Sequence, residues 1–257
     1  MNKLILVDGN NLYAIAYYSL KGNTSQLIDT FIGMLRSICE REQDATHMFI
    51  AWDSRESRKK KEDEAYKAGR QPKPPNYYNV WQPLQDRLTQ EKVQQYQVSG
   101  IEADDIIAKI IKAAKKKQCR CVIVSRDKDM YPLLEEDDTV YVYNPVDQDW
   151  FDYKKFVNKY GIKPNQYNYV VALMGKASNN TQGVKGIGER TAFKAIQTYG
   201  SLDGLYASDM EEVAKRFRKM LKEGKEDAYK TLKQIAFLED FQLPKSTYAQ
   251  MPEIFRF

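Results

Sequence analysis

The sequence predicts an α/β fold, in which helices flank a mostly parallel central sheet and a helical C-terminal region follows. Short apolar runs alternate with helical patterns over the first half of the chain, as they do when helices join buried parallel strands. From about residue 163 the apolar residues recur at helical spacing throughout. We therefore expect an α/β core over residues 1–160, with a helical arch at about 54–78, and a helical region over residues 161–257 packed on it.

The individual elements follow from these patterns in chain order. The apolar run LILVD predicts a buried strand at residues 4–8, and the apolar residues of 26–42 recur at helical spacing. Further elements of the core are expected as strands at 47–53, 96–98, 121–125 and 139–144 and as helices at 80–94 and 103–116. Helices of the C-terminal region are expected at 165–174, 189–199, 202–206, 210–221 and 226–235. The composition changes near 144–156, and we expect the apolar residues of the tail from 243 to pack on the core.

Composition limits the classes of function. The net charge of +5 is too small to indicate a nucleic-acid partner by itself. The single histidine, His47, leaves little room for histidine catalysis or a histidine-rich metal site. Cys39, Cys119 and Cys121 lack the spacing of a zinc site, so we expect reduced thiols in a cytoplasmic protein. No window approaches the roughly 18 apolar residues of a membrane span, and a strand pattern starts at the N-terminus, so we expect neither a membrane segment nor a signal peptide.

Acidic residues recur in four short clusters, each where a strand is expected to end or a helix to begin. They are Asp8, Asp53, Glu102, Asp104, Asp105, Asp127 and Asp129. Because parallel strands present their carboxyl ends at one edge of a sheet, we expect these carboxylates to gather there. Gathered carboxylates repel one another, and oxygen ligands without nearby His or Cys favour Mg²⁺ or Mn²⁺. For residues 102–105 alone, favourable interaction with the helix dipole is the simpler explanation; the other clusters shift the balance to a metal site.

A glycine-rich segment, GVKGIG at residues 183–188, separates two expected helices. Its glycines let the backbone turn tightly and approach a phosphate, while the N–H groups of the following helix point toward that phosphate. Three basic residues flank the turn: Lys185, Arg190 and Lys194. The pattern favours sequence-independent binding of a duplex, with an ordinary helix–helix turn as the alternative.

Residues 54–75 are highly charged, poor in aliphatic side chains and closed by prolines. Such a segment contributes little to a core, and we expect a mobile helix–loop that stands away from it, above the acidic edge. Its basic side chains would meet backbone phosphates and Tyr66 would stack on a base. These basic residues are Arg58, Lys59, Lys60, Lys67 and Arg70. A solvated charged loop is the alternative.

Together these motifs resemble the 5′-nuclease family, which includes the 5′→3′ exonuclease domain of bacterial DNA polymerase I, phage flap endonucleases and stand-alone relatives. The resemblance covers about residues 3–238. Its motifs stand in family order as LILVDGNNLYAIAY, AWDS, AYKAGR, GIEADDIIA, SRDKDMYPLL and GVKGIGERTA. It implies a PIN-like α/β core and a C-terminal helix–hairpin–helix.

The resemblance also implies an activity: hydrolysis of DNA phosphodiesters at 5′ ends, nicks or 5′ flaps with a divalent metal. It assigns most of the acids to a first metal, Asp127 and Asp129 to a second, and places Asp105 close to both. Lys67 and Arg70 would steady the scissile phosphate. In relatives the hairpin holds a K⁺ on backbone carbonyls, which here implies a K⁺ site at Gly183, Val184, Gly186, Ile187 and Gly188.

Two positions of the second-metal motif depart from the family. The family pattern Met-Gly-Asp-x-x-Asp-Asn reads Met-Gly-Lys-Ala-Ser-Asn-Asn here, so Lys176 and Asn179 replace two aspartates. An ammonium repels Mg²⁺ and an amide oxygen is a weaker ligand than a carboxylate, so we expect the second site to be weak or absent. Ile15 stands where the family has Arg, which removes a phosphate contact.

These departures leave alternatives open. The chain is a nuclease of reduced activity with one strong metal site, a junction- or flap-binding relative with little catalysis, or an engineered variant. The retained acids favour the nuclease, since without a metal they would only repel the phosphates of a substrate. An RNA 5′ segment, such as a replication primer, is an alternative substrate. We expect a monomer that works beside a separate polymerase.

Overall fold

The structure is a computed structural model that describes residues 2–245 and 251–256. It divides into two compact units. The sheet unit comprises residues 1–57, 72–152 and 238–257, and the helical unit comprises residues 58–71 and 153–237. Residues 58–71 of the expected arch fall in the helical unit, the two ends of the arch fall in the sheet unit, and the tail from residue 238 also belongs to the sheet unit.

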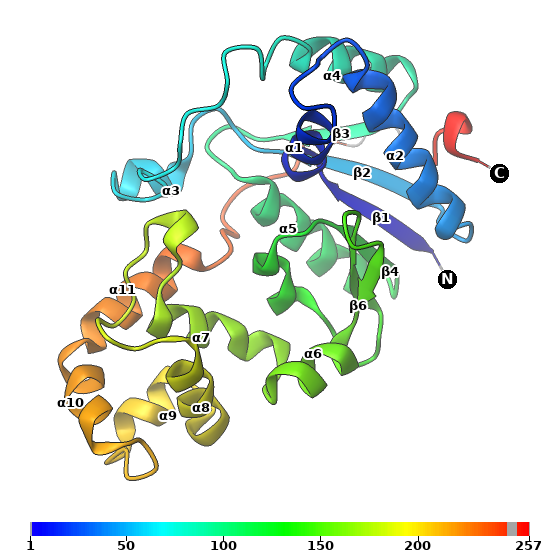
Figure 1. Ribbon diagram of the computed structural model, residues 1–257. Helices are drawn as coiled ribbons and strands as arrows, with labels where there is room; N and C mark the ends of the chain where they lie inside the picture. Colours follow the sequence, from blue (N-terminus) through cyan, green and yellow to red (C-terminus); the bar gives the residue numbers. More distant parts are fainter. Residues whose placement is uncertain (1, 246–250, 257) are drawn as a thin grey trace. The chain divides into compact units, whose positions relative to one another are not determined.

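The sheet unit is built on a six-stranded sheet with the order β3-β2-β1-β4-β5-β6 (Figure 1). The strands are β1 (Lys3–Asp8), β2 (His47–Trp52), β3 (Gln94–Gln97), β4 (Arg120–Val124), β5 (Val140–Asn144) and β6 (Asp149–Phe151). The first five run parallel, with Asp8 opposite Ala51 and Val7 opposite Val124, while β6 is antiparallel to β5. The predicted α/β class with a mostly parallel sheet is confirmed. β6 was not predicted, because its three residues carry no recognisable alternation.

Helices cover both faces of this sheet. They are α1 (Gly9–Ser19), α2 (Leu27–Arg41), α4 (Trp81–Gln90), α5 (Ala103–Lys116) and the 3₁₀ turns η1 (Lys128–Leu133) and η4 (Glu253–Phe255). Successive strand side chains point to opposite faces, so Ile5 and Val7 join one large buried cluster with α1, α2, α4 and η4. α5 lies against β1, β2 and β4 with its own apolar stripe. The tail residues Met251 and Phe255 belong to the buried cluster, as predicted for the end of the chain; residues 246–250 of the tail lie outside the described residues.

Two helices of the sheet unit differ from expectation. α1 was not predicted, because DGNN reads as a turn; Asp8 instead caps it by accepting a hydrogen bond from the Asn11 N–H at 3.0 Å. Gly9 permits the close approach of α1 to β2, since a Cβ there would lie 2.5 Å from the Trp52 ring. α4 ends at Gln90, short of the expected residue 94, because Lys92 adopts a left-handed conformation (φ 59°) that breaks the helix.

The helical unit carries the remaining helices. They are α3 (Arg58–Glu62), α6 (Tyr153–Tyr160), η2 (Pro164–Gln166), α7 (Tyr167–Met174), η3 (Ala177–Asn179), α8 (Glu189–Tyr199), α9 (Leu202–Ala207), α10 (Lys215–Glu223) and α11 (Lys225–Ile235). α7 packs against α8 and α11. α6 was not predicted, and α10 starts five residues later than expected because Met210 is left-handed (φ 62°). Throughout the described residues, every helix is too short or too polar to cross a membrane.

Candidate functional site

Acidic side chains gather at the carboxyl edge of the sheet. Asp8 is the last residue of β1, Asp53 follows β2, and Asp127 follows β4 by three residues. β1 is the neighbour of both β2 and β4, so the parallel arrangement brings these three acids to one edge. The sequence prediction that separate strands deliver carboxylates to a common place therefore agrees with the topology.

Asp8 occupies the centre of this edge. One carboxylate oxygen accepts from the Asn11 N–H and the other accepts from the Ser125 hydroxyl at 3.0 Å. The residue is 8% exposed. Burial, together with the negative charges of Asp53 and Asp127, raises the pKa of Asp8 to about 8. The hydrogen bonds from Asn11 and Ser125 oppose this rise in pKa, and a cation that shares the site would favour the ionised carboxylate further.

Asp53 joins the end of β2 to the start of α5. Its carboxylate accepts from the Ala103 N–H at 2.8 Å, and its own N–H donates to the Asn10 side-chain oxygen at 2.8 Å. The Gln97 amide donates to the Asp53 carbonyl at 2.8 Å. These bonds fix the direction of the Asp53 side chain beside the first turn of α5.

Three further carboxylates crowd that first turn. One oxygen from each of Glu102, Asp104 and Asp105 lies within 4.8 Å of the others. Glu102 accepts from the Ser57 hydroxyl at 3.0 Å, and the fully buried Asp105 accepts from the Leu238 N–H at 2.7 Å. A helix dipole favours acids that remain in water, but it does not explain three carboxylates held this close with two of them buried. The set supplies hard oxygen donors that fit a divalent cation.

The pair after β4 forms the remaining part of the acidic edge. The Asp127 carboxylate caps η1 by accepting from the Asp129 N–H at 3.0 Å, and the Asp127 N–H donates to the Ser125 hydroxyl at 3.1 Å. The Ser125 hydroxyl thus links Asp127 to Asp8. All seven predicted acids lie in the sheet unit, at strand ends or in the first turns that follow them.

Three residues that orient these acids were not predicted. Asn10 holds Asp53, Ser125 holds Asp8, and the Asn11 side chain accepts from the Arg126 N–H at 3.2 Å. The sequence places these polar residues next to the predicted acids. Two asparagines follow Asp8 after one glycine, and a serine precedes the Arg-Asp-Lys-Asp run. Polar residues beside metal ligands commonly hydrogen-bond to them, so these three residues were predictable as partners of the acids.

The arch is held against the helical unit. The Lys67 N–H donates to the Asn179 carbonyl at 2.8 Å, and the Asn180 amide donates to the Ala65 carbonyl at 2.9 Å. The Arg70 guanidinium donates to the Ser178 carbonyl at 2.9 Å and to the Asn179 side-chain oxygen at 3.0 Å. Residues 58–71 fall outside the sheet unit, as expected for a segment that stands away from the core, and they have defined partners in the helical unit; the mobility of the segment stays a prediction.

A second anchor of the arch lies at Asp63, directly after α3. Asp63 forms an ion pair with Lys230 of α11 at 3.1 Å and accepts from the Gln234 amide at 2.5 Å. The Lys230 hydrogen bond lowers the pKa of Asp63. Tyr66 is 3% exposed with the Lys67 ammonium 4.9 Å from its ring centre, and Lys59 is also buried. A role for Tyr66 in stacking or for Lys59 in phosphate binding stays a prediction that requires these side chains to leave their present positions.

The glycine-rich turn forms a tight loop between α7 and α8. Gly183 (φ 59°) brings its backbone so close to Gly175 that a Cβ would lie 2.3 Å from the Gly175 nitrogen. Val184 and Ile187 are buried and anchor the loop, whereas the flanking basic residues are exposed: Lys185, Arg190 and Lys194. A helix–hairpin–helix arrangement is present, and the K⁺ site and the duplex contacts stay predictions.

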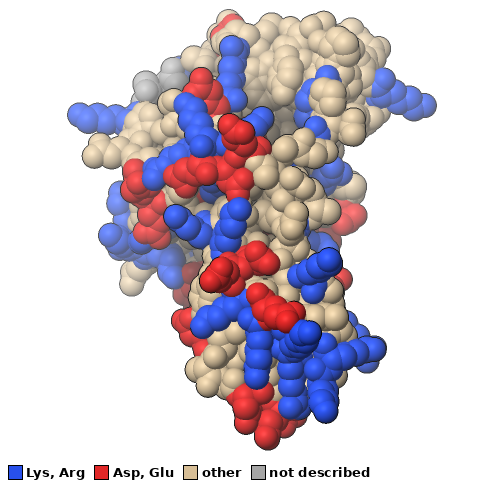
Figure 2. All heavy atoms as spheres, turned by 90° about the vertical axis from the view of Figure 1, so that its left-hand side faces the viewer, with Lys and Arg blue, Asp and Glu red and all other residues tan. Residues whose placement is uncertain are grey.

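α10 adds basic residues that were not predicted as part of the site. Gly186 of the hairpin lies against α10, because a Cβ there would be 2.9 Å from the Met220 sulfur. Figure 2 shows Lys and Arg side chains gathered toward the lower end of the view, where α10 lies in Figure 1. The exposed basic residues of α10 are Lys215, Arg216, Lys219 and Lys222. The charge that accompanies the hairpin is therefore larger than its own three residues supply.

The three departures from the family pattern have distinct environments. Ile15 is partly buried on α1. The Lys176 backbone pairs with Thr181 through hydrogen bonds in both directions, which closes the loop that contains Asn179. Asn179 is 3% exposed and its side chain accepts from Arg70. The amide that was expected to act as a poor metal ligand thus has a definite partner in the arch.

Comparison with known proteins assigns residues 3–251 to the two parts of one family. The family described as "5'-3' exonuclease, N-terminal resolvase-like domain" matches residues 3–161, and "5'-3' exonuclease, C-terminal SAM fold" matches residues 162–251. DNA polymerase I of Bacillus subtilis is 32% identical over 88% of this chain, and the thermostable DNA polymerase I of Thermus thermophilus is 32% identical over 87%. The match spans about 27% of the length of either relative.

Solved structures share the fold. The T5 D15 protein co-crystallised with metal ions superposes with a TM-score of 0.76 at 19% identity, covering 91% of this chain and 89% of that one. The catalytic core of Rad2 in complex with a DNA substrate superposes with a TM-score of 0.52 at 15% identity, covering 93% and 73%. The matches to both parts of the family, over nearly all described residues, show that the chain belongs to the 5′-3′ exonuclease family.

Proposed function

We propose that this protein is a structure-specific 5′ nuclease, a 5′→3′ exonuclease and flap endonuclease that hydrolyses DNA phosphodiesters with Mg²⁺ or Mn²⁺. The observation that supports the proposal is the acidic edge: carboxylates of four segments lie at strand ends or in the turns that follow them, three of them lie within 4.8 Å of one another, and burial with neighbouring charges raises the pKa of Asp8 to about 8. Buried, mutually repelling acids are costly, and a bound cation removes that cost.

Asp8, Asp53, Glu102 and Asp104 would hold the first metal, with Asp105 behind them. When bound, a divalent ion supplies charge neutralisation and an activated water for attack on phosphorus. The chain's own contribution is orientation. Ser125 and Asn11 fix Asp8, the Ala103 N–H fixes Asp53, and Ser57 fixes Glu102. Rigid placement of ligands is what makes such a site selective and fast.

Lys67 and Arg70 would bind the phosphate that is cut, and the hairpin with its exposed lysines would grip the duplex away from the cut. The family membership and the exposure of Arg70, Lys185 and Lys194 support these roles. Asp127 and Asp129 would contribute to a second metal, which we expect to bind weakly because Lys176 and Asn179 replace two acids of the family pattern. A K⁺ on the hairpin carbonyls is part of the same proposal.

The first experiment measures cleavage of a 5′-labelled flap and of a nicked duplex in Mg²⁺ and in Mn²⁺. Asp8→Ala and Asp104→Ala are expected to reduce the rate by at least about a hundredfold, because each removes a ligand. Asp29→Ala, which removes an exposed carboxylate from α2, is the matched control and should leave the rate unchanged. Flap binding by the same variants shows that they are folded.

The alternative, a junction-binding relative with little catalysis, predicts tight flap binding with no cleavage in either metal. That outcome would exclude the nuclease. The double variant Lys176→Asp, Asn179→Asp tests whether a weakened second metal site alone limits the cleavage rate. A large gain in rate would indicate that only these two positions limit activity, and little gain would indicate that other residues limit it too. An RNA 5′ segment in the same flap tests the alternative substrate.

A further inference from the structure

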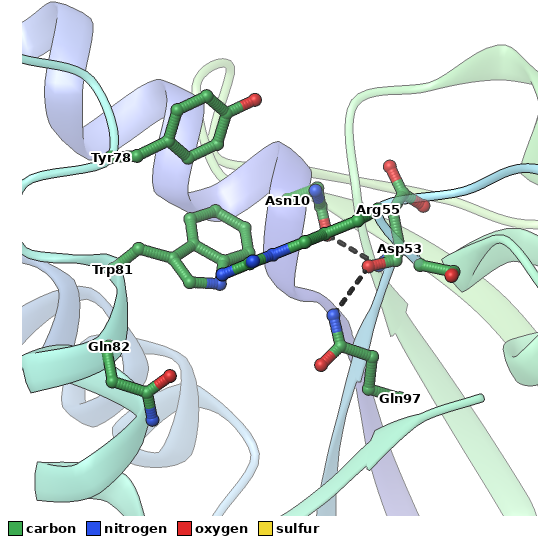
Figure 3. A pocket seen from close by; sticks show the side chains of 8 residues that line it. Asn10, Asp53, Arg55, Tyr78, Trp81, Gln82 and Gln97 are labelled. Carbon is green, nitrogen blue, oxygen red and sulfur yellow. Dashed lines mark hydrogen bonds between the residues drawn. The ribbon is translucent and has the colours of Figure 1, made fainter. Parts of the chain in front are cut away.

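A pocket of about 540 Å³ opens beside Asp53 within the sheet unit. Its lining residues are Asn10, Asp53, Ser54, Arg55, Tyr78, Trp81, Gln82 and Gln97 (Figure 3). We propose that this pocket binds one unpaired nucleotide of the DNA 5′ strand, with the base against Tyr78 and Trp81. The inference rests on the proposed nuclease function and adds a base-binding site, to which the two ends of the expected arch contribute Ser54, Arg55 and Tyr78.

One wall of the pocket is aromatic. Trp81 is held by edge-to-face contacts with Tyr13 at 4.7 Å and Trp52 at 4.8 Å between ring centres, so its indole has a fixed orientation. Tyr78 lies 5.8 Å from Trp81 and is 58% exposed. Figure 3 shows both rings on the side of the pocket opposite Asp53. A fixed indole beside an exposed phenol ring offers a stacking surface that any nucleobase fits, because every base has a π-face.

The side of the pocket that faces these rings is polar and carries Arg55 and Gln97, while Gln82 lies on the same side as the rings (Figure 3). Arg55 is exposed, and no carboxylate among residues 2–245 and 251–256 forms an ion pair with it. In Figure 3 its side chain extends from the Asp53 side toward Trp81. Gln97 is already oriented by its bond to the Asp53 carbonyl, and Gln82 by its bond to Asp86 at 2.9 Å. A guanidinium binds phosphate, and the free oxygens of these amides accept hydrogen bonds from base edges.

The position of the pocket decides which nucleotide it takes. Asp53 belongs both to the pocket lining and to the acidic edge that would hold the metal, so a bound nucleotide has its phosphate next to the reacting bond. A base that is paired in a duplex has its faces covered by its neighbours and cannot use the aromatic wall. The pocket would therefore favour strands whose nucleotide next to the cut is unpaired.

The test compares flaps that differ at single unpaired nucleotides. Each position near the junction is replaced in turn by an abasic nucleotide, and cleavage is measured with the unchanged protein and with Tyr78→Ala. We expect Tyr78→Ala to raise KM about tenfold for the intact flap, in keeping with the loss of one stacking contact. At one flap position, the abasic substitution should raise the KM of the unchanged protein by the same factor. With that abasic flap, Tyr78→Ala should not raise KM further.

Two controls keep the result specific. Tyr18→Ala removes an equally exposed tyrosine that does not line the pocket, and it should behave as the unchanged protein. Trp81→Phe keeps an aromatic core side chain while shortening the stacking surface, and it should raise KM without altering the unfolding midpoint greatly. If neither Tyr78→Ala nor Trp81→Phe distinguishes the intact flap from any abasic flap, the pocket does not bind a base.

The experiments distinguish an error in the pocket proposal from an error in the nuclease proposal. Loss of cleavage in Asp8→Ala with no effect at Tyr78 overturns only the pocket. If the protein cleaves no flap, the pocket is tested by binding instead. The affinities of the intact and abasic flaps are then compared between Tyr78→Ala and the unchanged protein. Equal binding of every flap by Tyr78→Ala and by the unchanged protein would overturn it there too.

Discussion

The Asp8 side chain has two structural roles. It caps α1 and it stands at the centre of the acidic edge. Burial and the neighbouring Asp53 and Asp127 charges raise its pKa to about 8, so without metal the carboxyl is protonated over most of the neutral range. The same group therefore links folding stability, metal binding and pH.

This linkage predicts how the metal-free protein responds to pH. Between about pH 4 and pH 8 the folded state holds a proton on Asp8 that the unfolded chain releases. The contribution of Asp8 to the free energy of unfolding is therefore complete at low pH, falls as pH rises, and is lost above about pH 8. Saturating Mn²⁺ should restore stability at pH 8.5 far more than at pH 5, because the metal binds the ionised carboxylate.

Thermal unfolding at pH 5, 6.5 and 8.5, with and without Mn²⁺, measures this response. Asp8→Asn keeps the size of the side chain and removes its titration, so its Tm should depend less on pH and gain less from Mn²⁺. The same Mn²⁺ shift at pH 5 and pH 8.5 in the unchanged protein would contradict the prediction.

At the scale of elements, the arch is positioned by contacts that its composition does not reveal. Asp63 is tied to α11, and Arg70 is tied to the loop that contains Asn179. The charged segment thus has a resting position in which its guanidinium already points at a fixed acceptor. A group held in one orientation loses less entropy when it binds a phosphate.

Asn179→Ala should loosen this position. We expect faster proteolysis within residues 58–71 and a cleavage rate lowered about fivefold, with the effects of Asn179→Ala and Arg70→Ala not additive because the two side chains act together. Ser178→Ala is the matched control, since Ser178 contributes its backbone carbonyl and keeps it. Additive effects in the double variant would show that Asn179 does not act through Arg70.

At the scale of the whole molecule, the end of the chain completes the core of the sheet unit. Phe255 is 2% exposed in the main buried cluster, and the Met251 N–H donates to the Thr46 carbonyl at 2.8 Å. The Leu238 N–H reaches Asp105 at the acidic edge. The last residues therefore stabilise the unit that carries the candidate metal site although they follow the helical unit in the chain.

Phe255→Ala should lower the free energy of unfolding of the sheet unit by about 3–4 kcal/mol, because it removes a buried aromatic ring. All three tryptophans, Trp52, Trp81 and Trp150, lie in the sheet unit, so tryptophan fluorescence in a urea titration reports on that unit. Glu253→Ala, an exposed change in the same turn, should have little effect. An unchanged midpoint for Phe255→Ala would show that the tail does not support the core.

Some helices and strands could be predicted from the sequence and others could not, for physical reasons. α5 and α8 begin and end where the sequence predicted, since amphipathic spacing and the residues at their ends are local signals. α1 and β6 were missed, because the first opens with turn-forming residues and the second is too short to show a period. The candidate metal ligands were predictable because a parallel sheet brings the ends of neighbouring strands together.

The sequence by itself determined the α/β class, the family resemblance and the acids of the candidate site, because these depend on local periodicity and on motifs that are continuous in the chain. Only the tertiary structure decided what orients and surrounds them. Ser125 meets Asp8 across 117 residues, Arg70 meets Asn179 across 109, and Tyr78 and Trp81 face Asp53 across a pocket. Such partners are chosen by packing between distant segments, and no pattern within either segment specifies them.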